Sequence, residues 1–462
     1  HPAWLAFTMV AAGGLLPCLV WAHSRRPGPP LVTMLGAQTI AFYATPIFVR
    51  NPDVMAYGLP AINSVALDVL LFGLALAGGW YHATNNVRYN PRPSYHRFGF
   101  IGGANEQRLI TLAPILLGVS VGYLLLNLLK LLFFVPSGGG PILRAIADSA
   151  GVGGALLGAY FVGMGLLRGL YRTLYWVLIV CHCVLTIYNY TLFPAAGLLM
   201  AMMLGMFLGG GRLPIIPFVV TILVLSFFNL SKFEMRRKYW EEGEAYANQG
   251  LAELPSRFTE WSTYSWEALT TEQADEQQTK RETQQLSKRV NNLSNLLDAR
   301  VAMEEYGVKP YGGGSYTIIP LLFVPRMFWI WGEEKPRTHE GMVRLNVHFG
   351  RQTREESMTT YISWGLLPEA YANFGSLWGA LVIGLALGFF AGYLERWARP
   401  FPFTSLQALI FLSIAVQFGT SFEMVASVWL TSMFQMVIAL VLGTVFFVTK
   451  VKPPPKEAAA PA

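Results

Sequence analysis

The chain has 462 residues, of which 53% are hydrophobic and 13% are charged, about half the charged share of an ordinary soluble protein. Its mean hydropathy is +0.41. Uncharged runs of about 20 residues, the length that a helix needs to cross a bilayer, recur along it. These features predict an all-α polytopic membrane protein and argue against a β-barrel, whose strands would be short and alternating. The net charge of +7 then reflects loop topology, and no nucleic-acid partner is expected.

Eleven apolar runs are the candidates for transmembrane helices. In chain order they cover 3–22, 30–49, 60–81, 109–135, 151–167, 173–189, 192–210, 213–230, 371–394, 401–420 and 424–449. The Pro- and Ala-rich end of the chain indicates disorder. The chain is therefore expected to contain a bundle of eight transmembrane helices over 1–230, an extracytoplasmic loop domain over 231–370, three C-terminal transmembrane helices over 371–449 and a disordered cytoplasmic tail over 450–462.

The cations of the short loops predict the orientation in the membrane. Residues 83–108 hold four arginines, and placing them in the cytoplasm puts most other short-loop cations on the same side. The long segment 231–369 then lies on the outer face, because long segments translocate largely regardless of their charge. The start of the chain also lies outside. Because the chain opens at His1 rather than Met, its first residues are expected to be missing, and one further helix upstream, which would return the N-terminus to the cytoplasm, is expected.

The long outer segment has several predicted parts. Residues 270–307 read as a helix, with apolar side chains recurring at threes and fours on one face. The glycines at 312–314 indicate a break. Residues 316–331 are apolar but too short for a full span and contain Pro320 and Pro325, so an interfacial or re-entrant piece fits better.

A cluster of cations follows in the same outer segment. It consists of Arg326, Lys335, Arg337, Arg344, Arg351 and Arg354, against three acids in the same window, and Glu355 and Glu356 follow directly and offset part of the excess. Arginine forks match the oxygens of a diphosphate bidentately, so the cluster suits a lipid diphosphate headgroup. Two other interpretations stay open from charge alone. Charge alone favours a solvated loop holding local ion pairs, and general attraction to anionic lipid is the second alternative.

Glu369 lies beside Pro368, just before the apolar run that opens at Tyr371. It has two interpretations: a carboxylate that caps the following helix through its dipole, or a base that accepts a proton from an attacking hydroxyl. Trp331 and Trp364 are candidates for stacking on sugar rings, although interfacial tryptophans also form the ordinary aromatic belt of membrane proteins.

Other chemistry has little support in the sequence. No P-loop, H-E-x-x-H, G-x-S-x-G or C-x-x-C motif is present, so neither a metal site nor a cofactor is predicted. Asp68 lies within the third predicted span. An ionisable residue at such a position is a functional candidate by default, with pairing inside the bundle as the alternative.

The motifs of the outer segment resemble those of the Wzy-type oligosaccharide repeat-unit polymerases. That family typically shows a PR-x-x-W-x-x-KP element followed by a GE-x-Y-x-NFG element that opens a helix. The chain reads PRMFWIWGEEKP over 325–336 and PEAYANFG over 368–375, preceded by RVNNLSNLL at 289–297 and YGGGSY at 311–316. The turn at 189–194 lacks the arginine of the family's Gly-Thr/Ser-Arg motif, so a cationic contact is either missing or supplied by Arg144.

The resemblance implies a GT-C-like, metal-independent glycosyltransferase at the outer face of the bacterial inner membrane. It would transfer a growing glycan from its polyprenyl diphosphate to the sugar end of a carrier-linked repeat. The implied residues are Glu369 and Arg326 for catalysis, Lys335, Arg337, Arg344 and Arg351 for the diphosphate, and Trp331, Trp364, Tyr371 and Asn373 for the sugar. The implied partners are the carrier-linked oligosaccharide, the bilayer, and a chain-length regulator and a flippase of the same pathway. The alternatives are an O-antigen-ligase-type transferase and a transporter of lipid-linked sugars.

Overall fold

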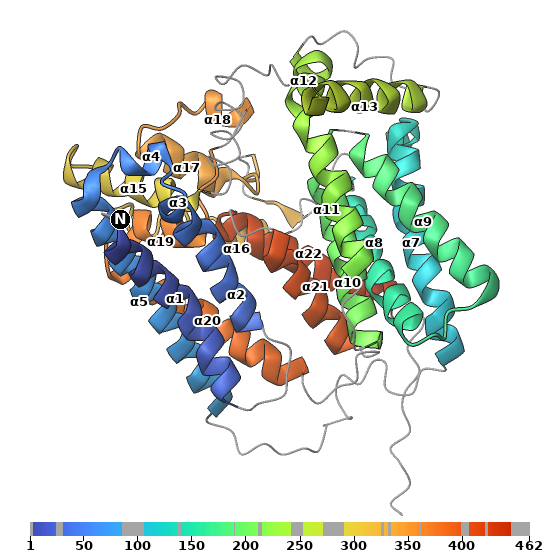
Figure 1. The fold of residues 1–462 in the computed structure, drawn as a ribbon, viewed down its shortest axis with the longest axis horizontal. Helices are drawn as coiled ribbons and strands as arrows, with labels where there is room; N and C mark the ends of the chain where they lie inside the picture. Colours follow the sequence, from blue (N-terminus) through green and yellow to red (C-terminus); the bar gives the residue numbers. More distant parts are fainter. Residues whose placement is uncertain are drawn as a thin grey trace, which may run out of the picture. The chain divides into compact units, whose positions relative to one another are not determined.

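The computed structural model is helical (Figure 1). It describes residues 3–24, 31–85, 106–135, 140–188, 190–210, 215–241, 253–270, 291–324, 328–330, 334–359, 362–398, 406–420 and 424–444. Within these residues every regular element is a helix, which confirms the predicted all-α fold class. The chain forms two compact units. The first comprises 1–90, 275–400 and 421–434, and the second comprises 91–274, 401–420 and 435–462.

The first unit joins the N-terminal helices to the later part of the chain. Its elements are α1 (Trp4–His23), α2 (Leu31–Thr39), η1 (Ile40–Ala44), α3 (Thr45–Phe48), α4 (Pro52–Met55), α5 (Gly58–Asn85), α15 (Asn292–Glu304), α16 (Ile319–Leu322), α17 (Glu340–His348), α18 (Glu356–Thr359), α19 (Leu366–Phe374), α20 (Trp378–Ala398) and the first part of α22 (Ala426–Thr444). Helix α5 packs along both α1 and α20, which gives this unit its core.

The second unit is built around four helices that are consecutive in the chain. Its elements are α7 (Glu106–Leu128), η2 (Leu131–Phe134), α8 (Gly140–Gly163), α9 (Gly169–Ile187), α10 (Phe193–Gly210), α11 (Ile215–Leu230), α12 (Lys232–Arg236), η3 (Arg237–Glu241), α13 (Leu254–Thr270), α21 (Leu406–Thr420) and the rest of α22. Helix α8 packs against both α7 and α10. The predicted outer segment 231–370 is thus divided between the two units at residues 274 and 275.

Seven of the described helices are long and apolar enough to cross a membrane. They are Trp4–His23, Leu31–Phe48, Gly58–Thr84, Leu109–Leu128, Leu143–Gly163, Gly169–Ile187 and Trp378–Ala398. Four shorter apolar helices follow at Pro194–Gly210, Ile215–Leu230, Leu406–Gly419 and Ala426–Leu442. Each predicted run overlaps one of these helices. The structure therefore supports a multi-pass helical membrane protein, while the count of eleven crossings stays a prediction.

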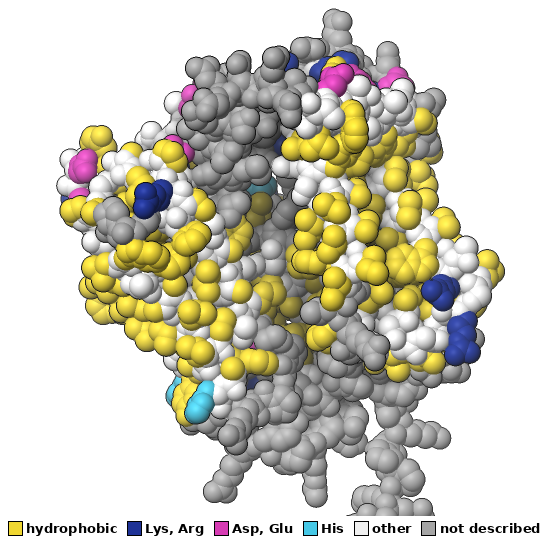
Figure 2. All heavy atoms as spheres, viewed as in Figure 1, with side chains coloured by type: hydrophobic (Ala, Val, Ile, Leu, Met, Phe, Trp, Pro, Cys, Tyr) yellow, Lys and Arg dark blue, Asp and Glu magenta, His cyan; other side chains and the backbone are white. Residues whose placement is uncertain are grey.

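Large apolar side chains cover the outward faces of these helices (Figure 2). In the second unit, no residue of α11 is buried, and Ile216 and Leu223 are 78% and 63% exposed. In the first unit, α1 exposes Leu5 and Leu19 to a similar degree. A contiguous apolar surface of this kind is unfavourable in water and stable against lipid chains, which agrees with the predicted class.

Small residues let the helices of the first unit approach closely. A Cβ atom at position 73 of α5 would lie 1.9 Å from the carbonyl oxygen of Gly13 in α1, so only glycine fits there. The same helix meets α20 at Gly388, where a Cβ would lie 2.3 Å from the Leu76 carbonyl oxygen. Close backbone contact at small residues is how membrane helices associate without a hydrophobic driving force.

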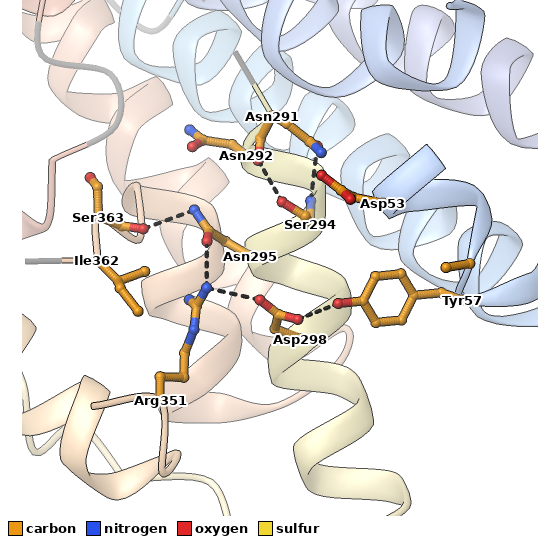
Figure 3. A pocket seen from close by; sticks show the side chains of 11 residues that line it. Asp53, Tyr57, Asn291, Asn292, Ser294, Asn295, Asp298, Arg351, Ile362 and Ser363 are labelled. Atoms are coloured by element: carbon orange, nitrogen blue, oxygen red, sulfur yellow. Dashed lines mark hydrogen bonds and ion pairs between the residues drawn. The ribbon is translucent and has the colours of Figure 1, made fainter. Parts of the chain in front are cut away.

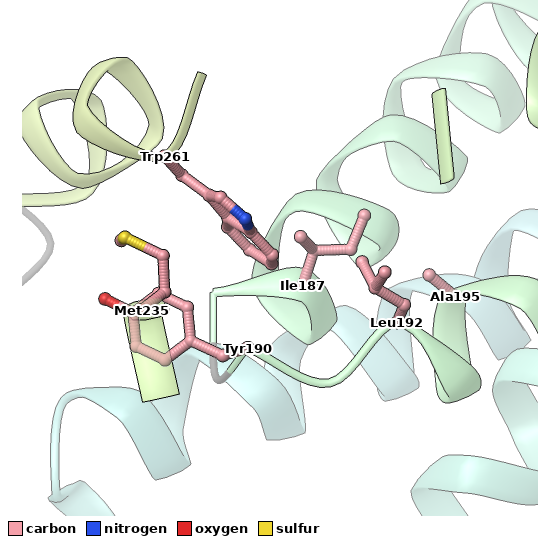
Figure 4. Packing of buried hydrophobic residues seen from close by; sticks show 6 residues of the cluster. All are labelled: Ile187, Tyr190, Leu192, Ala195, Met235 and Trp261. Carbon is pink, nitrogen blue, oxygen red and sulfur yellow. The ribbon is translucent and has the colours of Figure 1, made fainter. Parts of the chain in front are cut away.

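In the second unit, the segment after α11 folds back onto the turn between α9 and α10 (Figure 4). Six buried residues form this cluster: Ile187, Tyr190, Leu192, Ala195, Met235 and Trp261. Trp261 of α13 points toward Tyr190 and donates its indole N–H to the Phe228 carbonyl at 2.9 Å. The turn also receives a cationic contact, because Arg236 Nε donates to the Tyr190 carbonyl oxygen at 3.0 Å. Arg144, proposed from the sequence for this role, instead pairs with Asp148 at 3.6 Å.

The contact between α1 and α5 can be tested with two alanine substitutions on the same helix. Gly73→Ala forces the two backbones apart, and we expect it to lower the free energy of unfolding by about 1–3 kcal/mol, as overpacking does. Gly78→Ala is the matched control, because nothing lies within 4 Å of its Cβ position. Helix propensity alone should make that variant neutral or more stable by up to about 1 kcal/mol. Denaturation in mixed micelles measures both, and equal effects would contradict the proposed close contact.

Candidate active site

Helix α19 is a short buried element with a glycine at each end. Gly365 precedes it with φ +83° and Gly375 follows it with φ +78°, both in the left-handed region that glycine adopts without strain. Every residue from Leu366 to Asn373 is buried. The sequence had predicted that Tyr371 opens a long transmembrane helix. That prediction is corrected, because the chain breaks after Phe374 and α20 begins only at Trp378.

Asp68 fixes this break. Its carboxylate accepts hydrogen bonds from the Ser376 hydroxyl at 3.0 and 3.1 Å and from the Leu377 N–H at 2.8 Å. Leu377 has φ +64°, an unfavourable conformation for a leucine, which these bonds stabilise. The buried carboxylate of α5 thus has a structural role in holding the α19–α20 connection, in line with the second of its two interpretations.

The glycine-rich loop before α16 wraps around the C-terminal end of α19. The N–H of Tyr311 donates to the Ala372 carbonyl, and the N–H of Gly312 donates to the Asn373 carbonyl, both at 2.9 Å. These bonds satisfy carbonyl groups that the end of a helix leaves without intrahelical partners. The loop is the break predicted at 312–314, and its course places Ser315 directly beside Glu369.

The Glu369 side chain is completely buried, and both of its oxygens are hydrogen-bonded. Oε1 accepts from the Ser315 hydroxyl at 2.7 Å, and Oε2 accepts from the Ala426 N–H at 2.6 Å. Asn373 Nδ2 completes the network by donating to Ser315 Oγ and to the Glu369 carbonyl oxygen, each at 2.8 Å. Ala426 is the first residue of α22, so the carboxylate lies at the positive end of a helix dipole. The predicted capping role is therefore present, but the helix that Glu369 caps is α22.

Burial raises the pKa of Glu369 to about 7, although the Ala426 N–H and the Ser315 hydroxyl act in the opposite direction. The carboxyl group therefore exchanges its proton near neutral pH. Buried groups with such a shift are concentrated at functional sites, because a base that operates near pH 7 needs a pKa near 7. Helix α19 lies outside the seven candidate membrane spans, so this group belongs to the part of the unit beside them.

Helix α17 packs against the same network and carries one of the predicted diphosphate ligands. A Cβ at Gly341 would lie 3.1 Å from the Ser315 carbonyl oxygen, and the Ser427 hydroxyl donates to the Thr338 carbonyl at 3.0 Å. Arg344 follows one turn later on this helix. Its guanidinium pairs with Glu340 at 3.4 Å and also contacts Thr317 Oγ1 at 3.4 Å.

The remaining predicted diphosphate ligands have local partners. Arg337 lies 3.9 Å from Glu334, and Lys335 donates to the Leu322 carbonyl at 3.1 Å and to the Val324 carbonyl. Arg354 shares Glu340 with Arg344, at 3.2 Å. Two guanidinium groups thus contact one carboxylate, while Glu355 and Glu356 follow Arg354 directly and offset part of the positive charge. Several cations of the cluster thus form local ion pairs, as one of the sequence interpretations expected. The diphosphate interpretation stays a prediction, and it now centres on the cations near Arg344.

Arg351 and Trp364 are brought together, but away from the Glu369 network. The Arg351 guanidinium lies 5.0 Å from the Trp364 ring centre and pairs with Asp298 at 2.8 Å. Trp364 is fully buried and donates its indole N–H to Asn346 Oδ1 at 2.7 Å. With none of its surface exposed, the ring supports Arg351 and offers no face to a sugar in this structure.

Of the four remaining predicted site residues, two lie on α19 and two lie outside the described part of the chain. Tyr371 and Asn373 are 2% and 1% exposed on α19, and Asn373 belongs to the Glu369 network. Arg326 and Trp331 lie outside the described residues. Sequence reasoning missed Ser315 and Ala426, the two donors to Glu369. Ser315 directly follows the three glycines in the YGGGSY motif, and that position was the available signal.

No protein-family model, curated protein or solved structure matches the chain. Fold and site together define a class: a multi-pass helical membrane protein with a buried carboxyl group that titrates near neutral pH. Among the described residues, no group of three or more His, Cys, Asp or Glu side chains is placed to hold a metal ion.

The shifted pKa of Glu369 predicts a pH dependence of stability. Its folded-state pKa of about 7 lies above the ordinary 4.5, so the folded protein binds this proton more tightly than the unfolded chain. Stability from this group is full below pH 4.5 and is lost as the pH rises to about 7, in total roughly 3 kcal/mol. Glu369→Gln removes the titration. The difference in unfolding free energy between wild type and variant should therefore change by that amount between pH 5 and 8 in micelles, and a constant difference would contradict the assignment.

Proposed function

We propose that the chain is a glycan polymerase, a metal-independent glycosyltransferase that joins polyprenyl-diphosphate-linked oligosaccharide repeats at the outer face of a bacterial inner membrane. The observation that carries the proposal is the completely buried, hydrogen-bonded Glu369, whose pKa lies near 7. It stands in the PEAYANFG motif, and helix α17, which carries Arg344, packs against its network. Keeping such a carboxyl group away from water costs stability, and a role in proton transfer accounts for that cost.

In the proposed reaction, a hydroxyl of the acceptor repeat attacks the anomeric carbon of the growing glycan. A new glycosidic C–O bond forms, and the C–O bond to the carrier diphosphate breaks with its electron pair. The hydroxyl proton passes to Glu369, which must be ionised to accept it. In this structure the Ser315 hydroxyl covers Oε1, so the proposal requires the 311–316 loop to move aside before an acceptor reaches that oxygen.

The leaving diphosphate gains negative charge as the bond breaks. Preorganised cations stabilise such charge most when they are fixed in advance, at no cost in reorganisation during the reaction. Arg344 lies on α17, the helix that packs against Ser315, and its contacts with Glu340 and Thr317 fix its guanidinium group. Arg354 contacts the same Glu340 carboxylate and is a second cation there. These residues, together with Lys335, Arg337 and the predicted Arg326, are the proposed diphosphate ligands. Arg351 fits this role less well, because Asp298 already neutralises it.

The polymerase proposal can be tested in proteoliposomes supplied with one carrier-linked repeat and no other acceptor. A ladder of products identifies a polymerase. Absence of any product, with activity appearing only when a different final acceptor is added, identifies the ligase-type alternative. Movement of the intact lipid-linked sugar across the bilayer without bond formation identifies a transporter.

Glu369→Gln should slow product formation by about 10²–10⁴-fold, the usual contribution of a general base. The substitution retains the shape of the side chain and can preserve both contacts, with Oε1 facing the Ala426 N–H and the amide NH₂ facing Ser315. Glu305→Gln, at an exposed position after α15, is the matched control and should react at the wild-type rate. Wild-type product lengths and rates in Glu369→Gln would exclude Glu369 as the base.

The rate should also depend on pH in a defined direction. Because the ionised form of Glu369 is the active one, the rate at low substrate concentration should rise tenfold per pH unit below about 7 and level off above it. Initial rates measured from pH 5 to 8.5 give the profile. A rate that is independent of pH in this range, or that falls as the pH increases through 7, contradicts the assignment.

A further inference from the structure

The first unit contains a polar cavity apart from the Glu369 network (Figure 3). Its volume is about 660 Å³, within the range of about 300–1,000 Å³ that small-ligand sites occupy. Its wall comes from four parts of the chain. Residues 53–57 belong to α4 and the turn before α5, residues 291–298 open α15, Arg351 follows α17, and residues 362–363 precede α19.

Two asparagine side chains in this wall have unused hydrogen-bond donors. Asn291 and Asn292 are each 2% exposed, and neither Nδ2 atom has a partner among the described residues. The other end of the Asn291 amide is in use, since Oδ1 accepts from the Ser294 N–H at 3.0 Å and caps α15. A buried donor without a partner costs about 1–3 kcal/mol, so two at one cavity indicate that something outside the chain binds there.

A third unused donor comes from Arg351. Its Nη2 donates to Asp298 at 2.8 Å and to Asn295 Oδ1 at 3.1 Å, whereas Nη1 is buried without a partner in the described part of the chain. Asp298 also accepts the Tyr57 hydroxyl, which fixes the carboxylate in place. Figure 3 shows these side chains converging from α15 and from the loop after α17.

The charges of the cavity select the kind of ligand. Its lining contains two carboxylates, Asp53 and Asp298, and one guanidinium, Arg351. The lining is therefore not cationic, and it disfavours a diphosphate or another anion. Amide donors beside fixed carboxylate acceptors instead match hydroxyl groups, which both accept and donate hydrogen bonds. The wall thus suits an uncharged ligand rich in hydroxyl groups.

We propose that this cavity binds an uncharged segment of a glycan, with Asn291, Asn292 and Arg351 Nη1 donating to its hydroxyl oxygens. The choice of a glycan over another polyol rests on the proposed function, whose substrates are glycans. The site is separate from the Glu369 network, so it holds sugar rings away from the reacting bond. In this assignment Arg351 is a sugar ligand, and the diphosphate is left to the cations around Arg344.

The experiment measures binding directly, with no lipid carrier and no transfer reaction. Fluorescein-labelled maltotriose, cellotriose, mannotriose and chitotriose are titrated with the full chain in nanodiscs, and inorganic pyrophosphate serves as competitor. At least one neutral trisaccharide should bind, and pyrophosphate should not displace it. Asn292→Asp replaces a donor by an acceptor of the same size and should weaken binding by about tenfold or more. Asn291→Asp should do the same while preserving the helix cap.

Controls keep the test informative if a variant folds poorly. Both positions are buried, so a new carboxylate lowers the unfolding temperature, and binding is therefore compared well below that temperature. Asn292→Ala removes the same donor without adding a charge and should also weaken binding. Glu305→Gln, at an exposed position outside the cavity lining and the candidate membrane spans, should bind as wild type does. Binding by none of the four probes below about 10 mM would overturn the proposal, and so would equal binding by wild type and the cavity variants or displacement by pyrophosphate.

The outcomes also distinguish this site from the proposed function. Glu369→Gln should bind the trisaccharide with wild-type affinity, because its network is separate from the cavity. Trisaccharide binding without any product ladder would uphold the cavity and refute the polymerase. A product ladder without trisaccharide binding would support the polymerase and refute the proposed glycan-binding cavity.

Discussion

The carboxylate of Glu369 is the contact on which the arrangement of the first unit depends. Through Ser315 it holds the glycine-rich loop, and through Ala426 it holds the first residue of α22. The neighbouring Ser427 then binds the segment that leads into α17. Four parts of the chain therefore meet at one buried ionisable group. Such a group is stable only while its hydrogen bonds are made, because an unpaired buried carboxylate would cost several kcal/mol. The same burial raises the pKa of Glu369 to about 7. Burial therefore underlies both the packing around this carboxyl group and its proposed role as a base.

Helix α17 links the two sites of this unit without merging them. Its beginning packs against Ser315, and its later residue Asn346 accepts the indole N–H of Trp364 at 2.7 Å. Trp364 in turn lies under Arg351, whose own N–H donates back to the Asn346 carbonyl at 2.8 Å. The Glu369 network and the Arg351 side of the cavity are thus both supported by α17 and the residues that flank it. Rigid support of this kind is what precise positioning of reacting groups requires.

Much of the fold could be predicted from the sequence, because a helix that faces lipid must be apolar over its whole length. All eleven predicted runs overlap apolar helices for that reason. The break between α19 and α20 could not be predicted, because it depends on the left-handed conformation of Leu377 and on Asp68, which lies 309 residues away in the chain. The partners of Glu369 are similarly distant, at 54 and 57 residues. The cavity could not be predicted because asparagines at the start of a helix are ordinarily interpreted as N-caps. Only the fold shows that the Nδ2 groups of Asn291 and Asn292 have no hydrogen-bond acceptor among the described residues.

The distribution of charge separates the proposed chemistry into two parts. A diphosphate needs cations, and the proposed ones are Arg344 and Arg354, which share the single carboxylate of Glu340. A neutral glycan needs donors and acceptors without a surplus of charge, and this occurs where Arg351 is matched by Asp298. The cations that looked like one cluster in the sequence therefore belong to different environments, set by which acid the fold brings to each. Charge alone did not distinguish a binding site from a solvated loop here. What separates the two proposed sites is the pairing of their arginines. Arg344 and Arg354 share one carboxylate, whereas Arg351 has a carboxylate of its own and retains only an unused hydrogen-bond donor.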